Sequence, residues 1–307
     1  MSVNTYYSHG KLLLTGEYAV LDGAKALAFP CKLGQGLTVK ASSNSAFKWV
    51  SRLKSGDVWN ALTFSKEDII NVNAKDDFTN RLFSVLHQIY TQKPQHFEHP
   101  LHFSTHLEFD KNWGLGSSST LINNLANWAK IDPYQLLDTT FGGSGYDIAA
   151  AKSNSPFIFQ KKEKACQTKT IEFPKVLTPF IYFIYLNQKQ NSREGIKRYR
   201  AVNADNKTNA IDQISLITKN ILDVKGLSEF ESLMVQHEKI IAALTEQTPV
   251  QESKFKDYTH GIVKSLGAWG GDFVLVTAKE KSQLDYFKEK GFNSILKYSE
   301  LILDEIH

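Results

Sequence analysis

The chain has 307 residues, a formal net charge of +4, 42% hydrophobic and 22% charged residues, and two cysteines, Cys31 and Cys166. This composition is that of a globular protein with one large domain or two ordinary ones, and the scattered lysines give no indication of nucleic-acid binding. Because the cysteines are far apart and outside any C-x-x-C motif, they exclude a disulfide framework and a thiolate zinc site.

No apolar stretch approaches the length of a membrane span. Residues 1–5 also lack the charged and apolar regions of a signal peptide. We therefore expect a cytoplasmic protein whose fold begins almost at the first residue.

The first third of the chain is predicted to be rich in strands. A bend is expected at 15–18, and the pair Asp22-Gly23 predicts a turn. Apolar residues with helical spacing predict a helix over 76–92. The strands predicted around this helix are 5–15, 26–29, 37–40, 47–50, 58–64 and 101–109.

A glycine- and serine-rich stretch at 113–120 leads directly into a predicted helix. Gly114 and Gly116 let the backbone bend sharply and approach a ligand, and the hydroxyl residues 117–120 are typical of a helix start. The free amides and partial positive charge of a helix N-terminus attract phosphate. The stretch is neither G-x-G-x-x-G, because residue 119 is serine, nor G-x-x-x-x-G-K-[ST]. It predicts a phosphate-binding loop, with an ordinary hinged loop before a capped helix as the alternative.

A second glycine-rich turn at 142–145 precedes a helix of small residues at 147–151, and Asp132-Pro133 opens a short helix before that turn. The later elements are predicted as strands at 157–159, 169–173 and 180–186, helices at 193–202, 208–222 and 227–244, and a strand, helix and strand at 273–277, 282–290 and 294–298. A change of pattern near 156–166 indicates two α+β domains, 1–156 and 157–307.

Three features together favour phosphoryl transfer. Lys11 lies on an early strand beside a glycine, the loop at 113–120 offers a phosphate cradle, and Asp147 follows a Gly-Ser-Gly turn. Phosphoryl transfer depends on positioning and on positive charge around the transferred group, and a carboxylate near the acceptor hydroxyl can accept its proton. Each residue has an equally good alternative interpretation when it is taken alone: Lys11 as a solvated lysine on a strand, and Asp147 as a helix cap. Their joint occurrence favours catalysis.

The chain resembles the GHMP kinases, the group named for galactokinase, homoserine kinase, mevalonate kinase and phosphomevalonate kinase. Residues 10–23 are similar to the opening of mevalonate and phosphomevalonate kinases, and 143–151 contain Gly-Tyr-Asp-Ile-Ala, similar to the mark of the bacterial GYDIA family. The most specific match is the signature ATP loop Gly114-Leu115-Gly116-Ser117-Ser118-Ser119. The resemblance covers the whole length and implies a two-domain α+β kinase fold with a ferredoxin-like C-terminal half.

The resemblance also implies roles for individual residues. The ATP loop would wrap the phosphates, and Ser118 would lie near Mg²⁺. Asp147 would be the catalytic base or orient the acceptor hydroxyl, and Lys11 would stabilise the transferred phosphoryl group or lower the pKa of the hydroxyl. The residues implied for the acceptor end are Glu17, Tyr18 and Gly145.

Two departures from the family pattern concern the metal and a late motif. Leu136 and Leu137 occupy the positions where some mevalonate kinases have a Mg²⁺-binding glutamate, so Asp138 is the nearest candidate carboxylate. The late glycine-rich motif is present only in part, at 267–272, where Trp269 and Asp272 stand. We expect substrate or phosphate contacts there to differ from the family pattern.

Two further clusters carry charge or metal-binding groups. In the segment 189–200, Lys189, Ser192 and Arg193 are candidates for anchoring an acidic substrate, with a solvated basic helix face as the alternative. Four histidines crowd residues 96–106, but a metal site there is the weaker interpretation, because no carboxylate or thiolate pair accompanies them.

We therefore predict an ATP- and Mg²⁺-dependent kinase of a small alcohol or phosphate, with mevalonate or phosphomevalonate in isoprenoid precursor synthesis as the expected acceptor. The alternatives are a relative of mevalonate diphosphate decarboxylase and a non-catalytic ligand-binding protein on the kinase fold. The expected partner is a small acidic molecule rather than nucleic acid or a membrane. A homodimer is left open.

Overall fold

The computed structural model describes residues 3–42, 45–163, 165–188, 192–267, 269 and 272–305, without the side chains of 192–194. The chain forms two compact units, each built from separate stretches of sequence. Unit 1 contains residues 1–10, 33–111 and 116–152, and unit 2 contains 11–32, 112–115 and 153–307. The predicted domain boundary at 156 lies close to Ser153, where the chain enters unit 2 for the last time, but two earlier stretches also belong to unit 2.

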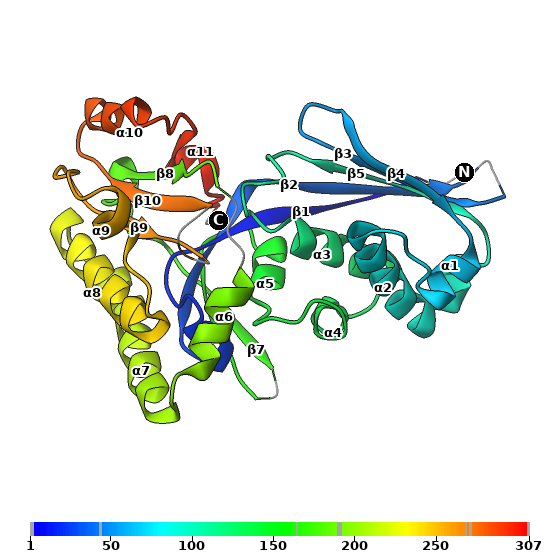
Figure 1. Ribbon diagram of the computed structural model, residues 1–307, viewed down its shortest axis with the longest axis horizontal. Coiled ribbons are helices and arrows are strands. Elements are labelled where there is room, and N and C mark those ends of the chain that lie inside the picture. The colour runs from blue at the N-terminus through cyan, green and yellow to red at the C-terminus, as the bar shows by residue number, and fades with distance from the viewer. Residues whose placement is uncertain are drawn as a thin grey trace. The chain divides into compact units, whose positions relative to one another are not determined.

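Unit 1 is a sheet with helices on one face (Figure 1). The hairpin of β3 (Phe47–Arg52) and β4 (Val58–Phe64) confirms the strands predicted there. Strand β3 pairs in parallel with β5 (Leu101–Leu107), which pairs antiparallel with β2 (Ala26–Ala41), and β2 also pairs with β1 (Asn4–Leu13). The helices of this unit are α1 (Lys66–Asn71), α2 (Asp77–Gln92), α3 (Ser117–Ala129), α4 (Pro133–Asp138) and α5 (Tyr146–Lys152).

The core of unit 1 lies between the sheet and these helices. The apolar spacing that predicted a helix over 76–92 corresponds to the buried face of α2, which includes Leu82, Leu86 and Ile89. Trp128 of α3 meets Phe103 of β5 edge to face, with ring centroids 5.0 Å apart. Aromatic pairs of this geometry stabilise a core beyond their buried area, so they fix α3 on the sheet.

Strand β2 is continuous, whereas the sequence predicted two short strands at 26–29 and 37–40. Pro30 and the two glycines at 34 and 36 interrupt the apolar pattern, and proline cannot donate a hydrogen bond within a sheet. The carbonyl of Pro30 nevertheless accepts a bond from the amide of Leu303 (2.9 Å). A side chain at Gly34 would overlap the backbone of Ser8, so glycine there allows β1 to pass closely.

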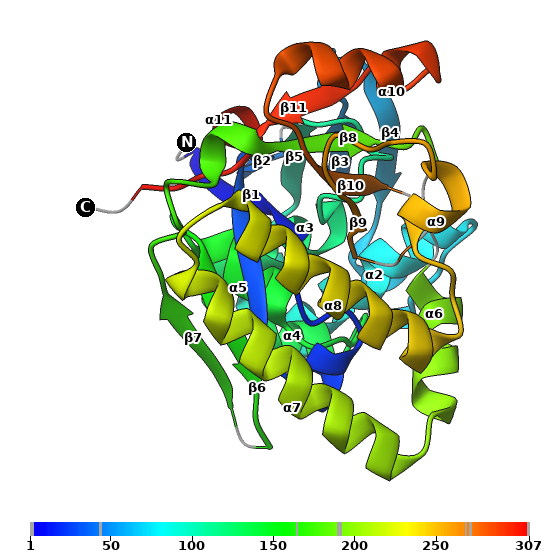
Figure 2. The same cartoon turned by 90° about the vertical axis from the view of Figure 1, so that its left-hand side faces the viewer.

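Unit 2 contains an antiparallel sheet in the order β11-β8-β10-β9. Its strands are β8 (Ile181–Tyr185), β9 (Val263–Ser265), β10 (Phe273–Thr277) and β11 (Ile295–Lys297). Figure 2 shows α7 (Ala204–Asn220) and α8 (Leu227–Thr245) side by side in this unit. The remaining helices are α6 (Ser192–Ala201), α9 (Val250–Lys254), α10 (Asp285–Glu289) and α11 (Tyr298–Leu301). The hairpin of β6 (Phe157–Lys161) and β7 (Cys166–Thr170) pairs with the first residues of β2.

The long elements of unit 2 confirm the sequence prediction, and several short ones correct it. The predicted helices at 208–222 and 227–244 correspond to α7 and α8. The predicted strand 169–173 is shifted to β7, and the predicted helix 282–290 begins as the 3-10 helix Lys281–Leu284 before α10. Short α1, α9, α11 and β9 were not predicted, because elements of three to six residues carry too little periodicity. Among the described helices, none has the length and apolarity that crossing a membrane requires.

Candidate functional site

The first turn of α3 has the features of an anion-binding helix N-terminus. Gly116 precedes the helix with φ +89°, a left-handed conformation that glycine adopts readily, and it has no side chain to cap the first amides. The Ser119 hydroxyl donates to the Gly116 carbonyl (2.9 Å), so it is used within the turn. Ser118 is exposed, and no hydrogen bond of its hydroxyl is found among the described residues. Of these two serines, Ser118 is therefore the better placed to meet a ligand.

A buried polar network holds this part of α3 on the sheet of unit 1. The Thr120 hydroxyl donates to the side chain of Gln35 (2.7 Å), and the Asn124 amide donates to the Gln35 carbonyl (2.8 Å). Ser8 of β1 donates to Asn124 (2.7 Å) and accepts from Asn123 (2.9 Å). One buried oxygen of this network, Oδ1 of Asn123, has no hydrogen-bond partner among the described residues. These asparagines were not predicted to be buried, because only the apolar face of their helix has a recognisable pattern.

Asp147 lies in unit 1 as well, on the first turn of α5, which packs against α3. Its side chain is half-buried, and its Oδ1 accepts a bond from the amide of Ile148 (3.1 Å). The preceding turn needs glycine, since Gly143 has φ +125° and Gly145 has φ +89°. The predicted base and the predicted phosphate loop are thus carried by two helices in direct contact.

The other end of the loop, residues 112–115, belongs to unit 2 together with Lys11. The Lys11 amide donates to the Leu115 carbonyl (3.0 Å), which joins the end of β1 to the loop. Gly114 has φ +67°, and a side chain there would overlap the carboxylate of Asp272. The aspartate that departs from the family's late motif therefore lies against the predicted ATP loop.

Lys11 also lies close to a buried thiol. Cys31 on β2 is fully buried, and burial raises its pKa to about 12, with the positive charge of Lys11 opposing the shift. Cys166, by contrast, is half-buried at the start of β7. The Lys11 side chain itself is half-buried.

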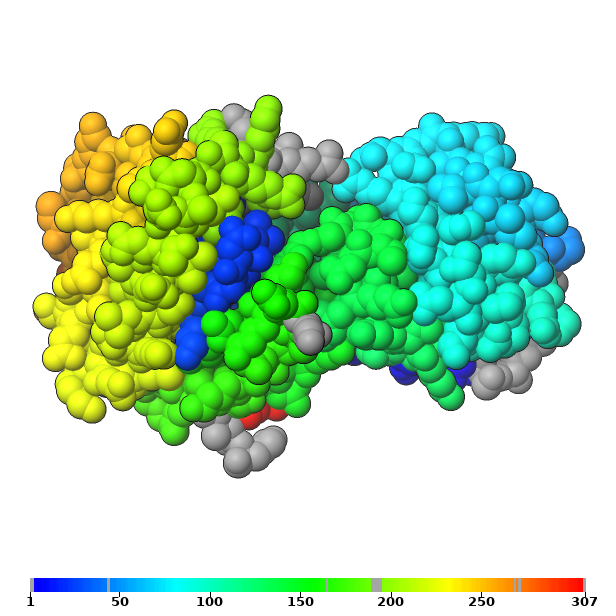
Figure 3. Space-filling model, turned by 90° about the horizontal axis from the view of Figure 1, so that it is seen from below, coloured from blue at the N-terminus to red at the C-terminus, as the bar shows by residue number. Residues whose placement is uncertain are grey.

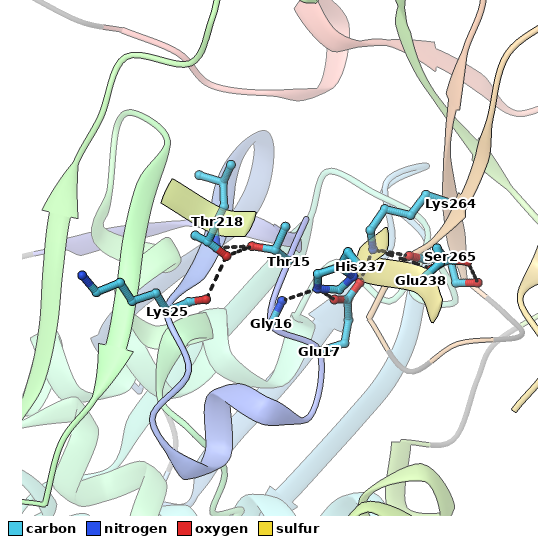
Figure 4. Close-up of polar contacts among 10 residues, drawn as sticks. Thr15, Gly16, Glu17, Lys25, Thr218, His237, Glu238, Lys264 and Ser265 are labelled. Carbon is cyan, nitrogen blue, oxygen red and sulfur yellow. Dashed lines mark hydrogen bonds and ion pairs between the residues drawn. The ribbon is translucent and has the colours of Figure 1, made fainter. Parts of the chain in front are cut away.

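Glu17 lies in a buried cluster of charged and polar groups in unit 2 (Figure 4). Its Oε1 is 2.6 Å from Nζ of Lys264 on β9, and both side chains are fully buried. The same Nζ donates to the Ser265 carbonyl (2.8 Å) and lies 3.9 Å from Oε1 of Glu238 on α8. The Gly16 amide donates to Nε2 of His237 (3.0 Å). Of the residues in this cluster, only Glu17 was predicted from the sequence as a site residue.

The protonation of the cluster follows from these contacts. Nε2 of His237 accepts from the Gly16 amide and also lies 3.2 Å from Oε2 of Glu17. Burial and the nearby Lys264 lower the pKa of His237 well below the usual value, so the imidazole is neutral. Burial raises the pKa of Glu17, opposed by Lys264, and raises that of Glu238 to about 8. Lys264 is much closer to Glu17, so Glu17 is the ionised partner and Glu238 holds a proton.

A second set of contacts holds the segment just before Glu17. The Thr15 hydroxyl is 2.8 Å from that of Thr218 on α7, and the Leu27 amide donates to Thr15 Oγ1 (2.9 Å). Gly16 adopts φ +89°, and a side chain there would crowd Ala26. The chain after β1 is therefore fixed to α7, α8 and β9, and its course is determined by tertiary contacts.

Tyr18 connects this segment with the basic helix α6. Its backbone has φ 60° and ψ −49°, which is strained for a residue other than glycine. Its ring stacks on Tyr199 with centroids 6.2 Å apart, and a side chain at Gly195 would overlap its hydroxyl. Arg198 is near enough to oppose the rise that burial causes in the Tyr18 pKa. Figure 3 shows the following segment, which includes the 3-10 helix Ala19–Asp22 (blue), at the surface beside α7 (yellow-green).

The other predicted site residues are placed only in part. Lys189 lies outside the described residues, as do the side chains of Ser192 and Arg193. Asp138 is the exposed last residue of α4. In the part of the chain that the structure describes, no group of three or more histidine, cysteine, aspartate or glutamate side chains is arranged to hold a metal ion.

Comparisons with solved structures match nearly the whole chain. The Methanococcus jannaschii mevalonate kinase is 17% identical, with a TM-score of 0.71 and 99% of each chain covered. The Streptococcus pneumoniae phosphomevalonate kinase, in complex with phosphomevalonate and AMPPNP, is 13% identical (TM-score 0.70, 96% of this chain and 99% of that chain). The Lactococcus lactis galactokinase complexed with galactose is 14% identical (TM-score 0.70, 99% and 94%). The chain has the fold of these kinases.

This shared fold agrees with the predicted α+β class. Most strands of the two sheets were predicted, but β9 was not, and β7 is shifted from its predicted position. No protein-family model and no curated protein sequence matches the chain. The three similar proteins are named as kinases of three different substrates, and each is only 13–17% identical to this chain. The fold by itself therefore does not specify the substrate.

Proposed function

We propose that the protein is an ATP- and Mg²⁺-dependent small-molecule kinase of the GHMP type that phosphorylates mevalonate or phosphomevalonate. The observation that carries this proposal is the uncapped N-terminus of α3 behind Gly116, at the position of the ATP-loop motif, in a chain with the fold of these kinases. A helix N-terminus supplies free amides and partial positive charge for phosphate. An ATP analogue is present in one of the similar kinases, which supports ATP as the phosphoryl donor.

The Mg²⁺ ion would be held mainly by the nucleotide. Mg²⁺ prefers hard oxygen ligands and is commonly bound by one or two protein groups together with substrate phosphates. The exposed hydroxyl of Ser118 fits this role, and Asp138 is the candidate carboxylate from the sequence. Asp272 adds a second candidate carboxylate, because it lies against Gly114. When bound, the ion would neutralise charge on the phosphates.

In the proposed reaction, the acceptor oxygen forms a bond to the γ-phosphorus of ATP as the bond to the ADP oxygen breaks. Asp147 would accept the proton of an acceptor hydroxyl, and Lys11 would stabilise the negative charge on the transferred group. For a phosphate acceptor, which is already ionised, Asp147 would only orient the attacking oxygen. The fixed course of the chain between Lys11 and Tyr18 supports a preorganised site, since three separate elements hold it.

The acceptor end is proposed around Tyr18 and α6, with Glu17, Gly145, Lys189, Ser192 and Arg193 as the sequence-derived candidates. The packing of Tyr18 on α6 supports this grouping, because it joins two segments that the sequence assigned separately to the acceptor. A basic helix beside the acceptor favours a substrate with a carboxylate or phosphate group. Arg198 is added to the candidates because its charge acts on Tyr18.

Several finer assignments belong to the same proposal. The order β11-β8-β10-β9, with helices after β8 and β10, is that of a ferredoxin-like β-α-β-β-α-β unit and supports that assignment for the C-terminal half. Membership of the GYDIA branch rests on residues 145–149, and domains 1–156 and 157–307, a cytoplasmic location and a homodimer are proposed from the sequence alone.

The test is an ADP-release assay with Mg·ATP against mevalonate, phosphomevalonate, diphosphomevalonate, homoserine and galactose. Turnover of one of the first two supports the proposal. Carbon dioxide release from diphosphomevalonate would replace it with the decarboxylase alternative. If none of the five compounds is turned over but Mg·ATP still raises the melting temperature, the result would favour a non-catalytic protein or another acceptor. Saturation at a hundred times the dissociation constant should stabilise the fold by about 3 kcal/mol.

Two substitutions test the residue roles. With a hydroxyl acceptor such as mevalonate, Asp147→Asn should lower kcat by about 100-fold or more while Mg·ATP still raises the melting temperature. Turnover of that acceptor within tenfold of the wild type would mean that Asp147 is not the base. Lys11→Met should lower kcat more than it weakens Mg·ATP binding, and an effect on affinity alone would assign Lys11 a binding role. Glu67→Gln is the matched control, because it changes an exposed carboxylate of α1 in unit 1 that has no role in the proposed reaction, and it should leave kcat unchanged.

A further inference from the structure

Four lysines that are scattered along the sequence come together in unit 2, near the start of β2. They belong to the residue before β2, the hairpin of β6 and β7, and the last turn of α7, and they are Lys25, Lys162, Lys169 and Lys219. We call these four residues the lysine cluster. Lys25 is half-buried and the other three are exposed, so the cluster is open to solutes. None of its members is assigned above to the nucleotide, to catalysis or to the acceptor.

The backbone of Lys25 is held on α7 without help from its own side chain. Its amide donates to the Ser215 hydroxyl (3.0 Å), and its carbonyl accepts from the Thr218 hydroxyl (3.0 Å). Figure 4 shows the Lys25 side chain extending away from Thr218. The fold therefore fixes the position of this lysine while its ammonium group is left for another purpose.

The sheet and α7 bring the other lysines to the same place. Leu27, Ile158 and Lys169 occupy paired positions across β2, β6 and β7, so their side chains share one face of the sheet. Lys25 lies two residues before Leu27 and is directed to that face as well. Lys219 directly follows the threonine of α7 that binds the Lys25 carbonyl.

The ammonium groups of Lys25 and Lys219 are in hydrogen-bond contact. A charged lysine has three donors and no acceptor, so two charged ammonium groups cannot satisfy each other. Burial lowers the pKa of Lys25 below its usual value, and the positive charges of the other three lysines lower it further. An anion at this contact would accept hydrogen bonds from both groups and remove their repulsion.

No carboxylate in the described ranges neutralises the lysine cluster, since none of its members forms an ion pair there. An exposed lysine of the same unit does find a partner, because Lys288 lies 2.6 Å from Asp285. Asp22 and Glu163 line a surface cavity together with Lys162, but both are exposed to solvent and neither pairs with it. The positive charge of the cluster is therefore available to an anion from solution.

The end of a helix accounts for only one of these lysines. Lys219 lies in the last turn of α7, where a cation complements the partial negative charge of the helix C-terminus. Lys25 and the two lysines of the hairpin have no such reason to be there. Gathering like charges destabilises the folded protein through repulsion, and a ligand that neutralised them would restore that stability.

We propose that the lysine cluster binds a small molecule through a phosphate or diphosphate group. A phosphate monoester carries a charge of about −1.5 to −2 at pH 7 and three strong acceptor oxygens, whereas a carboxylate carries a single charge. Lysine binds phosphate as a point charge, and several ammonium groups around one ligand favour the more highly charged anion. This site is separate from the proposed kinase site and does not depend on it.

The test is calorimetry on the whole protein at pH 7 without Mg²⁺, with pyrophosphate, inorganic phosphate and acetate as ligands. The affinity should decrease in that order, because the charge of the anion decreases. Pyrophosphate should also raise the melting temperature, since it binds only the folded cluster. Acetate binding as tightly as pyrophosphate would overturn the proposal, because it would mean that the charge of a phosphate group is not what the site selects.

Three variants and one control locate the site. Lys25→Met and Lys219→Met should each weaken pyrophosphate binding by about tenfold or more, because each removes a charged hydrogen-bond donor. Lys219→Arg keeps the charge at an exposed position and should bind pyrophosphate more tightly than Lys219→Met. Lys288→Met is the matched control, because it removes an exposed lysine of unit 2 that is paired with a carboxylate, and it should leave the affinity unchanged.

The same variants separate this site from the predicted nucleotide loop. Pyrophosphate bound at the N-terminus of α3 instead would be displaced by AMPPNP and would be kept by both methionine variants of the cluster. That result would overturn the proposal, as would the absence of pyrophosphate binding to the wild type. An equal loss of affinity in Lys288→Met would also overturn it, because it would show an effect of overall charge alone.

Discussion

Glu238→Gln should stabilise the protein at neutral pH but not at acid pH. In the folded protein the pKa of Glu238 is about 8, against an ordinary value of 4.5. Above pH 4.5 the unfolded chain loses this proton while the folded protein keeps it, so the wild type loses stability as pH rises toward 8. Glutamine has the same shape, can still accept the Ser265 bond and does not titrate. The difference in the free energy of unfolding should therefore grow by about 1.4 kcal/mol per pH unit, to about 3 kcal/mol at pH 7.

Urea unfolding followed by tryptophan fluorescence measures this difference at a series of pH values between about 5 and 8. Other titrating groups are common to both proteins and cancel in the comparison. Glu252→Gln is the matched control, because it removes an exposed carboxylate on α9, also in unit 2. A difference between Glu238→Gln and wild type that does not change with pH would refute the reasoning, because it would mean that Glu238 is already ionised in the folded protein.

Two further predictions concern α6 and α3. Gly195→Ala should lower the melting temperature by several degrees, because the added side chain would overlap the Tyr18 hydroxyl. Adding Tyr18→Phe to this variant should recover part of the loss. Gly226→Ala is the control and should have little effect, because the space around Gly226 is open. Ser118→Ala should raise the KM for Mg·ATP without changing the melting temperature, whereas Ser119→Ala should destabilise the fold by about 1 kcal/mol through loss of its bond to the helix start. Equal effects of the two serine substitutions on KM would argue against the separate roles.

Structural features that depend on a local sequence pattern could be predicted from the sequence. The long amphipathic helices α2, α7 and α8 were predicted to within a few residues, because their apolar spacing extends over several turns. The glycine-rich turns before α3 and α5 were also predicted, and the positive φ of Gly116 and Gly145 shows why glycine stands there. Motif resemblance pointed to the kinase fold that the structural comparisons found.

Contacts between residues that are far apart in the sequence could not be predicted from local sequence patterns. Glu17 and Lys264 are separated by 247 residues, and Lys264 lies on a strand of only three residues that has no period to detect. His237 and Glu238 were read as part of an amphipathic helix, since burial and ionic partners leave no local signal. Strand β2 was predicted as two strands for a related reason. Its own sequence contains proline and glycine, whereas the backbone hydrogen bonds that keep it continuous come from β5 and β6.

The unequal burial of the two cysteines has a practical consequence. Maleimide reagents attack the thiolate form of cysteine, which a fully buried thiol of high pKa rarely offers. Cys31 is therefore protected in the native protein, and Cys166, half-buried at the start of β7, is the accessible thiol. The unmodified chain thus provides one attachment point for a fluorophore or spin label, and labelling under native conditions needs no engineered cysteine.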